Sequence, residues 1–142
     1  MKTSLLLIFL FSIFGFQSPG ELTVTVSNLS PLEGAIYIAI YDNREDYMSV
    51  EAAVFSKVVP VENGTQSIVF TDVPDGEYAV SVFQDLDGSG ELSMKTFGPP
   101  KEPYGFSNNV RGKMGPPSFE NAKISFTGSM EVEIELVNKA KK

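Results

Sequence analysis

The feature that most constrains the fold is a two-residue alternation of apolar and polar side chains, which recurs in short segments along most of the chain. The clearest segment is MEVEIELV (130–137), in which Glu131, Glu133 and Glu135 separate the apolar residues. Because successive side chains of a strand point to opposite faces, this pattern predicts a strand with one face in a core and the other in solvent. Similar segments occupy 22–29, 34–42, 65–72, 77–84 and 123–126, and a less regular strand is expected over 53–59. The residues expected to face the core are Leu22, Val24, Val26, Ile36, Ile38, Ile40, Ile68, Phe70, Tyr78, Val80, Val82, Ile124, Phe126, Met130, Val132, Ile134 and Leu136.

Turn-forming residues separate the alternating segments, at 31–34, 63–64, 74–76 and 128–129. About seven short strands at this spacing predict an all-β fold, an antiparallel β-sandwich, with a helical turn over 42–52. The chain has 142 residues, of which 42% are hydrophobic, and no cysteine. This is enough for one domain to bury a core without disulfides, so we expect a single β-sandwich over 21–142.

The first twenty residues (1–20) have the layout of a secretory signal peptide. One charged residue, Lys2, precedes an apolar run at 5–14, and small and polar residues follow the run. Because the run is shorter than the roughly 20 residues that span a bilayer, we expect cleavage between Phe16 and Gly20 and no stable membrane anchor afterwards. A retained anchor is the alternative. The mature protein is therefore predicted to be exported, either periplasmic or extracellular.

Charge and composition exclude several classes of function. The chain has 11 basic and 18 acidic residues, and loss of Lys2 with the leader leaves 10 basic residues and a net charge near −8. An acidic surface repels phosphate backbones, so we expect no nucleic-acid partner. The chain also lacks histidine, which excludes Ser-His-Asp and Cys-His triads and removes the commonest zinc ligand.

The segment DLDGSGEL (85–92), here named the acidic loop, places oxygen-bearing side chains at alternate positions with glycines between them. Calcium takes six to eight oxygen ligands, and this spacing resembles the beginning of an EF-hand calcium loop. The end of the loop departs from that pattern, since Thr96 stands where a bidentate Glu is expected. A calcium site here would have Asp85, Asp87, Ser89 and Glu91 as ligands, completed from outside the loop. Candidates for the outside ligands are Asp42, Glu45, Asp46 and Asn108. A solvated turn without metal is the alternative, and the residues leave both open.

The segment 93–121 interrupts the alternation with five prolines and four glycines. Its aromatic residues argue against disorder, so we expect one long ordered loop; they are Phe97, Tyr104, Phe106 and Phe119. The segment is also locally basic, which makes the acidic loop its natural electrostatic partner; its cations are Lys95, Lys101, Arg111 and Lys113.

Part of this segment combines aromatic faces, amides and one fixed positive charge, a mixture suited to a sugar or a peptide carboxylate. We expect it to bind an unknown small ligand, a sugar or a peptide, through Tyr104, Phe106, Ser107, Asn108, Asn109 and Arg111. Alternatively these residues only brace the loop, with Arg111 paired to the acidic loop and the Asn side chains capping turns.

Three segments in this order resemble a bacterial exported family catalogued as DUF2141, a domain of unknown function: GAIYIAIYD, VPDGEYAVSVFQDLDGSGEL and FGPPKEPYGFSNNVRGKMGPPSFENA. The resemblance covers about residues 21–137, and its most specific part is 102–120. It implies a transthyretin-like or immunoglobulin-like β-sandwich and supplies no activity. The family pattern often has His where this chain has Gln84, so a catalytic role of that His in relatives would be lost here.

These observations favour a monomeric, non-enzymatic binding or cell-envelope accessory protein with a calcium site in the acidic loop. The alternative is a hydrolase of glycans that uses Asp85, Asp87 and Glu91 as acid and base. No cleft for such a reaction is evident from a chain this short.

Overall fold

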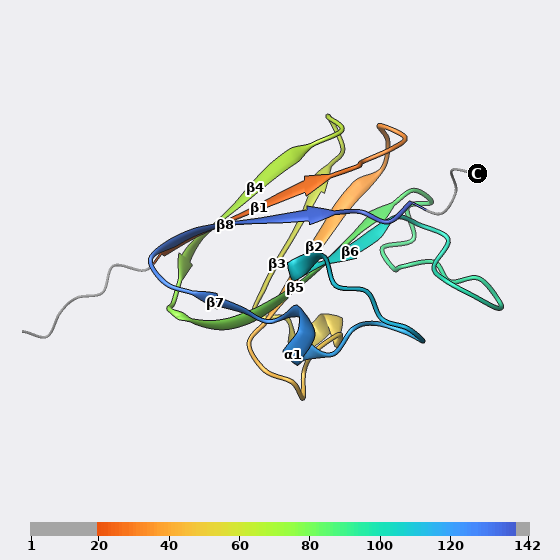
Figure 1. The fold of residues 1–142 in the computed structure, drawn as a ribbon. Helices are drawn as coiled ribbons and strands as arrows, with labels where there is room; N and C mark the ends of the chain where they lie inside the picture. The colour runs from red at the N-terminus through yellow and green to blue at the C-terminus, as the bar shows by residue number, and fades with distance from the viewer. Residues whose placement is uncertain (1–19, 139–142) are drawn as a thin grey trace, which may run out of the picture.

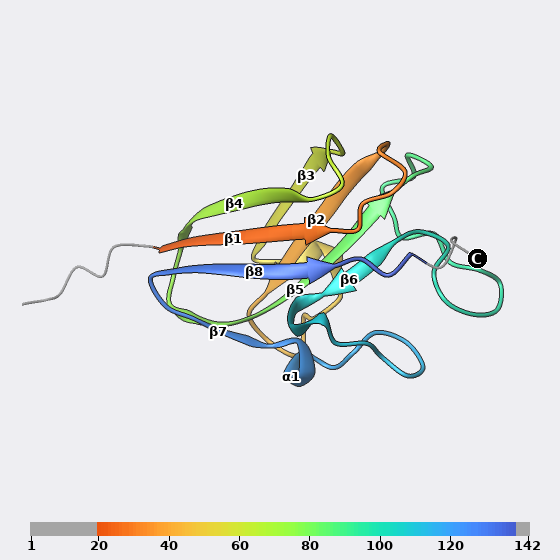
Figure 2. The same cartoon turned by 45° about the horizontal axis from the view of Figure 1, so that its top comes forward.

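The computed structural model describes residues 20–138, which form two β-sheets packed face to face (Figures 1 and 2). The predicted leader lies outside the described residues except for Gly20, which begins the first strand. Within 20–138, no helix has the length and apolar character needed to cross a membrane. The elements, in chain order, are β1 (Gly20–Ser27), β2 (Ala35–Tyr41), η1 (Val50–Ala52), β3 (Phe55–Pro60), β4 (Gln66–Val73), β5 (Gly76–Asp85), β6 (Tyr104–Phe106), η2 (Ser107–Asn109), α1 (Phe119–Ala122), β7 (Ile124–Phe126) and β8 (Ser129–Glu135).

One sheet has three strands in the order β4-β1-β8, and the other has five, with β3-β2-β5-β6 in a row and β7 paired to β5. The expectation of an antiparallel sandwich was wrong for one pair: β1 and β8 run parallel, with Leu22 opposite Met130 and Val26 opposite Ile134. The first and last strands, β1 and β8, thus lie side by side in one sheet (Figure 2), and turn chemistry between neighbouring segments gives no sign of such a distant pairing.

The alternation predicted the core correctly. Val24, Ile36 and Ile134 are fully buried, and of the predicted core residues Met130 alone is only partly buried. The glutamates of β8 are exposed on the opposite face. Burial of each large aliphatic side chain stabilises the fold by about 1.5–3 kcal/mol before conformational entropy is counted.

The fold has eight strands rather than about seven, because 93–121 contains the short strand β6. Three residues cannot show a periodic pattern, and the central one is Gly105. A Cβ at that position would lie 2.7 Å from Cγ2 of Ile134, so the close approach of β6 to β8 requires glycine. The helical turn predicted for 42–52 is present as η1.

A second, smaller cluster lies on the outer face of the five-stranded sheet and consists of Tyr41, Ala79, Phe106, Phe119 and Ala122. It fixes α1 and the end of the long segment to the sheet (Figure 1). The aromatic residues of the segment therefore do hold much of it in place, as expected. Phe97 is the exception, since its side chain is 92% exposed.

Candidate functional site

The acidic loop begins where β5 ends, and its first residue, Asp85, is buried with 3% of its surface exposed. The Asp85 carboxylate accepts backbone N–H bonds from Gly88 (2.9 Å), Ser89 (3.3 Å) and Gly90 (2.9 Å). Gly88 and Gly90 have φ of 71° and 75°, a left-handed conformation that glycine adopts without steric cost. The loop is therefore wrapped around this carboxylate.

Glu102, which was not among the residues predicted as ligands, secures the same loop from outside. It is 5% exposed, and its Oε1 accepts N–H bonds from Leu86 (2.9 Å) and Asp87 (3.4 Å). Its Oε2 accepts the N–H of Ser93 at 2.9 Å. One carboxylate thus joins the two ends of the acidic loop. No spacing rule identifies such a residue, because its partners lie 9 to 16 positions earlier in the chain.

Three carboxylates converge at this loop: Asp85, Asp87 and Glu102 each place an oxygen within 4.8 Å of the other two. Of the predicted calcium ligands, Asp85 and Asp87 belong to this group. Ser89 and Glu91 do not; the Ser89 hydroxyl donates to the Glu91 carbonyl at 2.9 Å, within the loop.

The outside ligands proposed from the sequence are not part of this group. Asp42 and Asp46 instead accept hydrogen bonds from the side chain of Asn43. Asn108 donates to the carbonyls of Asn121 and Lys123.

The negative charge of the three carboxylates suits a hard cation, but several of their oxygens already accept hydrogen bonds. Among residues 20–138, no lysine or arginine forms a salt bridge with any of them. Hydrogen bonds from Ser93 and Ser89 hold the pKa of Asp87 well below its usual value of 3.8, so this exposed carboxyl is ionised at neutral pH. Each carboxylate oxygen can accept more than one bond, so a cation could share these oxygens with the backbone donors. The calcium site stays a prediction, with Asp85, Asp87 and Glu102 as its carboxylate ligands.

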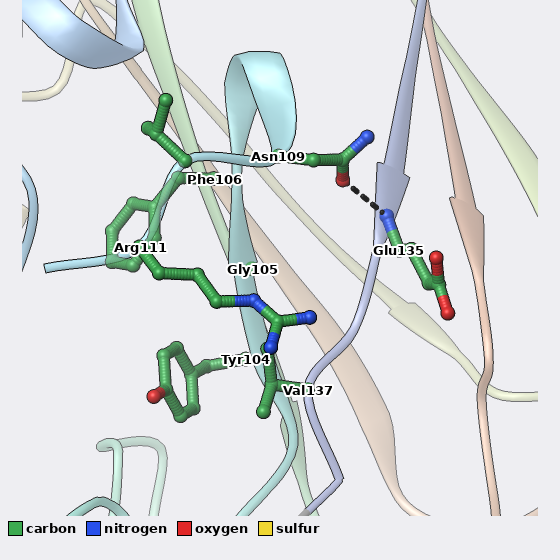
Figure 3. Close-up of a pocket in the computed structure, with 8 residues that line it drawn as sticks. Tyr104, Gly105, Phe106, Asn109, Arg111, Glu135 and Val137 are labelled. Atoms are coloured by element: carbon green, nitrogen blue, oxygen red, sulfur yellow. Dashed lines mark hydrogen bonds between the residues drawn. The ribbon is translucent and has the colours of Figure 1, made fainter.

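Ser107, Asn108 and Asn109, predicted as ligand-binding residues, form internal hydrogen bonds. The buried Ser107 hydroxyl accepts the N–H of Val80 (2.9 Å) and donates to the carbonyl of Ala122 (2.5 Å). Asn109 accepts the N–H of Glu135 at 2.8 Å through its Oδ1, the contact drawn in Figure 3. It thereby covers part of the free edge of β8. These bonds agree with the bracing interpretation.

Arg111 agrees with neither interpretation in full. It forms no salt bridge within residues 20–138, so the expected pairing with the acidic loop is not found. Figure 3 shows its side chain extending past Gly105 toward Tyr104 and Val137. The hollow that these residues line holds about 20 Å³, enough for about one water molecule and too small for a sugar ring.

A much larger concavity covers the outer face of the five-stranded sheet. This groove has a volume of about 580 Å³, within the range of small-molecule sites. On its floor Tyr37 of β2 and Phe83 of β5 stack with ring centroids 4.8 Å apart and planes inclined by 16°. Tyr104 and Phe106 of β6 also line it, so these two predicted ligand-binding residues do lie at a cavity.

Two loops form the walls of the groove. Met48, Val50 and Glu51 come from the segment between β2 and β3, and Glu91 and Leu92 from the acidic loop. The further residues that line the groove are Ile38, Ala39, Tyr41, Ser56, Lys57, Val58, Ser81, Val82 and Gly90. The acidic loop and the cavity are therefore parts of one site, and the loop determines the position of one wall.

Gln84, the residue at the position where the family pattern often has His, is fully buried on the opposite face of β5 from Phe83. Its side-chain amide donates to the carbonyls of Pro31 (2.7 Å) and Glu33 (2.9 Å), so it ties the loop between β1 and β2 to the sheet. In this chain the position has a structural role.

Comparison with known proteins gives one match. The family model described as "Uncharacterized protein conserved in bacteria (DUF2141)" matches residues 24–135, which extend from within β1 to the last residue of β8. No curated protein and no solved structure matches the chain.

Proposed function

The chain belongs to the bacterial family DUF2141, whose description names no activity, and we propose that this member is an exported, non-enzymatic protein that binds a small ligand in its groove. The observation that carries the proposal is the cavity of about 580 Å³ over the outer face of the five-stranded sheet. Inner-face residues form the core of the sandwich, whereas Tyr37 and Phe83 lie partly exposed on the other face. Aromatic side chains in a concave surface supply large contact area at little cost in conformational entropy.

The lining indicates the chemistry of the ligand. The stacked Tyr37 and Phe83, with Tyr104 beside the groove and Leu92 in its wall, favour a ligand with an extended apolar face. Ser56, Ser81 and Glu91 supply hydroxyl and carboxylate groups for hydrogen bonds. A saccharide, with its C–H faces and hydroxyl edges, or a short peptide has this combination.

The non-enzymatic part of the proposal rests on the carboxylates. Of the residues considered for a hydrolase, Asp85 and Asp87 are not among those that line the groove, whereas Glu91 is. Both oxygens of Asp85 already accept backbone N–H bonds. The carboxylate pair expected among Asp85, Asp87 and Glu91 for glycoside hydrolysis is therefore not assembled in the groove, whose other wall carries Glu51.

The test is binding of the mature protein to glycan and peptide arrays, with Tyr37→Ser and Phe83→Ser as variants. We expect wild type to bind a restricted set of ligands and each variant to lose most of that binding, because each removes an aromatic contact worth about 1–3 kcal/mol. Val69→Ser is the control, since Val69 is an exposed apolar residue on β4, in the other sheet. Equal loss in the control, or unchanged binding in both groove variants, would contradict the proposal.

A further inference from the structure

Two loops of the segment between β5 and α1 end in the same short sequence, an apolar residue followed by Gly-Pro-Pro. The first is Phe97-Gly-Pro-Pro, at 97–100, and the second is Met114-Gly-Pro-Pro, at 114–117. Their glycines have nearly the same φ, 112° at Gly98 and 114° at Gly115. A Cβ at either glycine would meet no atom within 4 Å, so the turn itself and not lack of space requires glycine. Both loops thus use the same short sequence and place its glycine at nearly the same positive φ.

In both loops this turn presents its apolar residue to solvent. The Phe97 side chain is 92% exposed and that of Met114 is fully exposed. They are the two most exposed large hydrophobic residues between 20 and 138. A single exposed hydrophobic side chain needs no explanation, but two at the ends of matching turns point to a common partner.

Each turn is also flanked by two cations and no carboxylate: Lys95 and Lys101 in the first loop (93–101), Arg111 and Lys113 in the second (110–117). None of the four forms a salt bridge within the described part of the chain. The other described cations are engaged, and they are Arg44 with Glu120, Lys123 with Glu77 and Glu120, and Lys57 with the carbonyl of Val69.

Both loops project from the same end of the sandwich, the end opposite the start of β1, in the two views of Figures 1 and 2. The chain carries a net charge of −7 and the acidic loop directly precedes the first of the two loops, yet four cations that form no salt bridge within residues 20–138 flank the two apolar tips. Such a surface is complementary to a partner that is both anionic and able to accept apolar side chains.

We propose that the two loop tips, 93–101 and 110–117, dock the protein onto the surface of an anionic lipid bilayer. Phe97 and Met114 enter the boundary between headgroups and acyl chains, while Lys95, Lys101, Arg111 and Lys113 contact lipid phosphates. A soluble polyanion would use the cations but not the apolar tips, so the pairing of the two favours a bilayer. This docking is independent of the ligand of the groove, and it is peripheral and reversible, since two side chains bury little apolar area.

The experiment is co-sedimentation of the mature protein with vesicles of phosphatidylglycerol and phosphatidylcholine in equal parts, or of phosphatidylcholine alone. We expect binding to the anionic vesicles at low salt, weaker binding at high salt, and little binding to the neutral vesicles. The double variant Phe97→Ser/Met114→Ser should bind the anionic vesicles about tenfold or more weakly, because insertion is lost. Lys95→Gln/Lys113→Gln should weaken binding by roughly 25-fold, at about fivefold for each charge removed.

Val54→Ser and Arg44→Gln are the matched controls, because Val54 is 41% exposed and Arg44 is an exposed cation, both outside the two loops and the lining of the groove. They should bind as wild type does. The proposal is overturned if wild type does not prefer anionic vesicles, or if the tip variants and the controls behave alike. A different outcome is that only Lys95→Gln/Lys113→Gln weakens binding, and that wild type binds a soluble polyanion such as heparin as well as it binds the anionic vesicles. In that case the partner is a polyanion and the bilayer proposal is wrong. Thermal unfolding of each variant verifies that it is folded.

Discussion

At the scale of single residues, the buried polar groups decide how the loops attach to the sandwich. Gln84 donates to two carbonyls, whereas Asp85 and Glu102 accept backbone N–H groups. An amide and a carboxylate are not interchangeable here, because the partners on one side are acceptors and on the other side donors. Each of these side chains therefore specifies one arrangement of one loop.

Tyr47 differs, since its buried hydroxyl, like Oε1 of Gln84, has no hydrogen-bond partner among residues 20–138. Burial, with a smaller contribution from Tyr41, raises the pKa of Tyr47 to about 12 from its usual 10.0. Because the unfolded chain ionises at lower pH, the contribution of Tyr47 to stability is complete below pH 10 and is lost as pH rises through 12.

We therefore expect Tyr47→Phe to be at least as stable as wild type at pH 7, because it removes a buried hydroxyl that has no partner within residues 20–138, and to lose less stability in alkali. The difference in the free energy of unfolding should reach about 1–2 kcal/mol near pH 12, less than the full shift implies because the side chain is partly exposed. Denaturant titrations between pH 8 and 12 measure it. Burial also raises the pKa of Tyr41 and of Tyr78, so the variant keeps some alkaline sensitivity. Identical pH profiles for the two proteins would contradict this account.

At the scale of elements, short-range patterns located the strands and the acidic loop. They did not identify the residues from distant parts of the chain that contact these elements. The spacing of Asp85 and Asp87 is visible within one segment, and the structure brings these two carboxylates together. Glu102 and Asn109 act on backbone groups far along the chain, so their roles follow from the fold alone. Strand β6 escaped prediction for a related reason, since its pairing with β5 and not its composition defines it.

The acidic loop gives a prediction at this scale. Calcium at ten times its dissociation constant, a concentration expected in the millimolar range, should raise the melting temperature of wild type by about 3–6 °C. EDTA should reverse the rise. Asp87→Asn should abolish the rise without unfolding the loop, because Asp87 is exposed while Asp85 and Glu102 hold the backbone. Glu91→Gln is the control, since Glu91 is outside the carboxylate group. If wild type shows no rise, the loop is a turn held by its own hydrogen bonds.

At the scale of the whole molecule, the alternation predicted the two-layer all-β architecture and its core, whereas the order of strands in the sheets could not be read from it. The parallel pairing of β1 with β8 joins residues more than 100 positions apart, from Glu21 with Ser129 to Ser27 with Glu135. Sequence patterns indicate which side of a strand is apolar, but they do not indicate which strands lie next to it in the sheet. Eight strands permit many pairings with the same buried faces.

This pairing predicts how the molecule folds. A chain that ends at residue 128 lacks β8 and with it the buried Val132, Ile134 and Leu136. It should show no cooperative thermal unfolding by circular dichroism, whereas a chain that ends at residue 138 should unfold in one transition. A cooperative transition in the shorter chain would show that β8 is dispensable.

Refolding of the complete domain should take milliseconds to seconds, because most of its native contacts are long-range.

The meeting of the first and last strands also bears on how the chain is made. Until the ribosome has passed residue 135, β1 has only β4 as a neighbour and one of its edges stays open. The nascent polypeptide thus lacks a finished tertiary structure for nearly its whole synthesis, and extended chains are what a secretion channel can thread. If residues 1–20 act as a leader to such a channel, as the sequence predicts, the topology delays maturation until the far side of the membrane is reached.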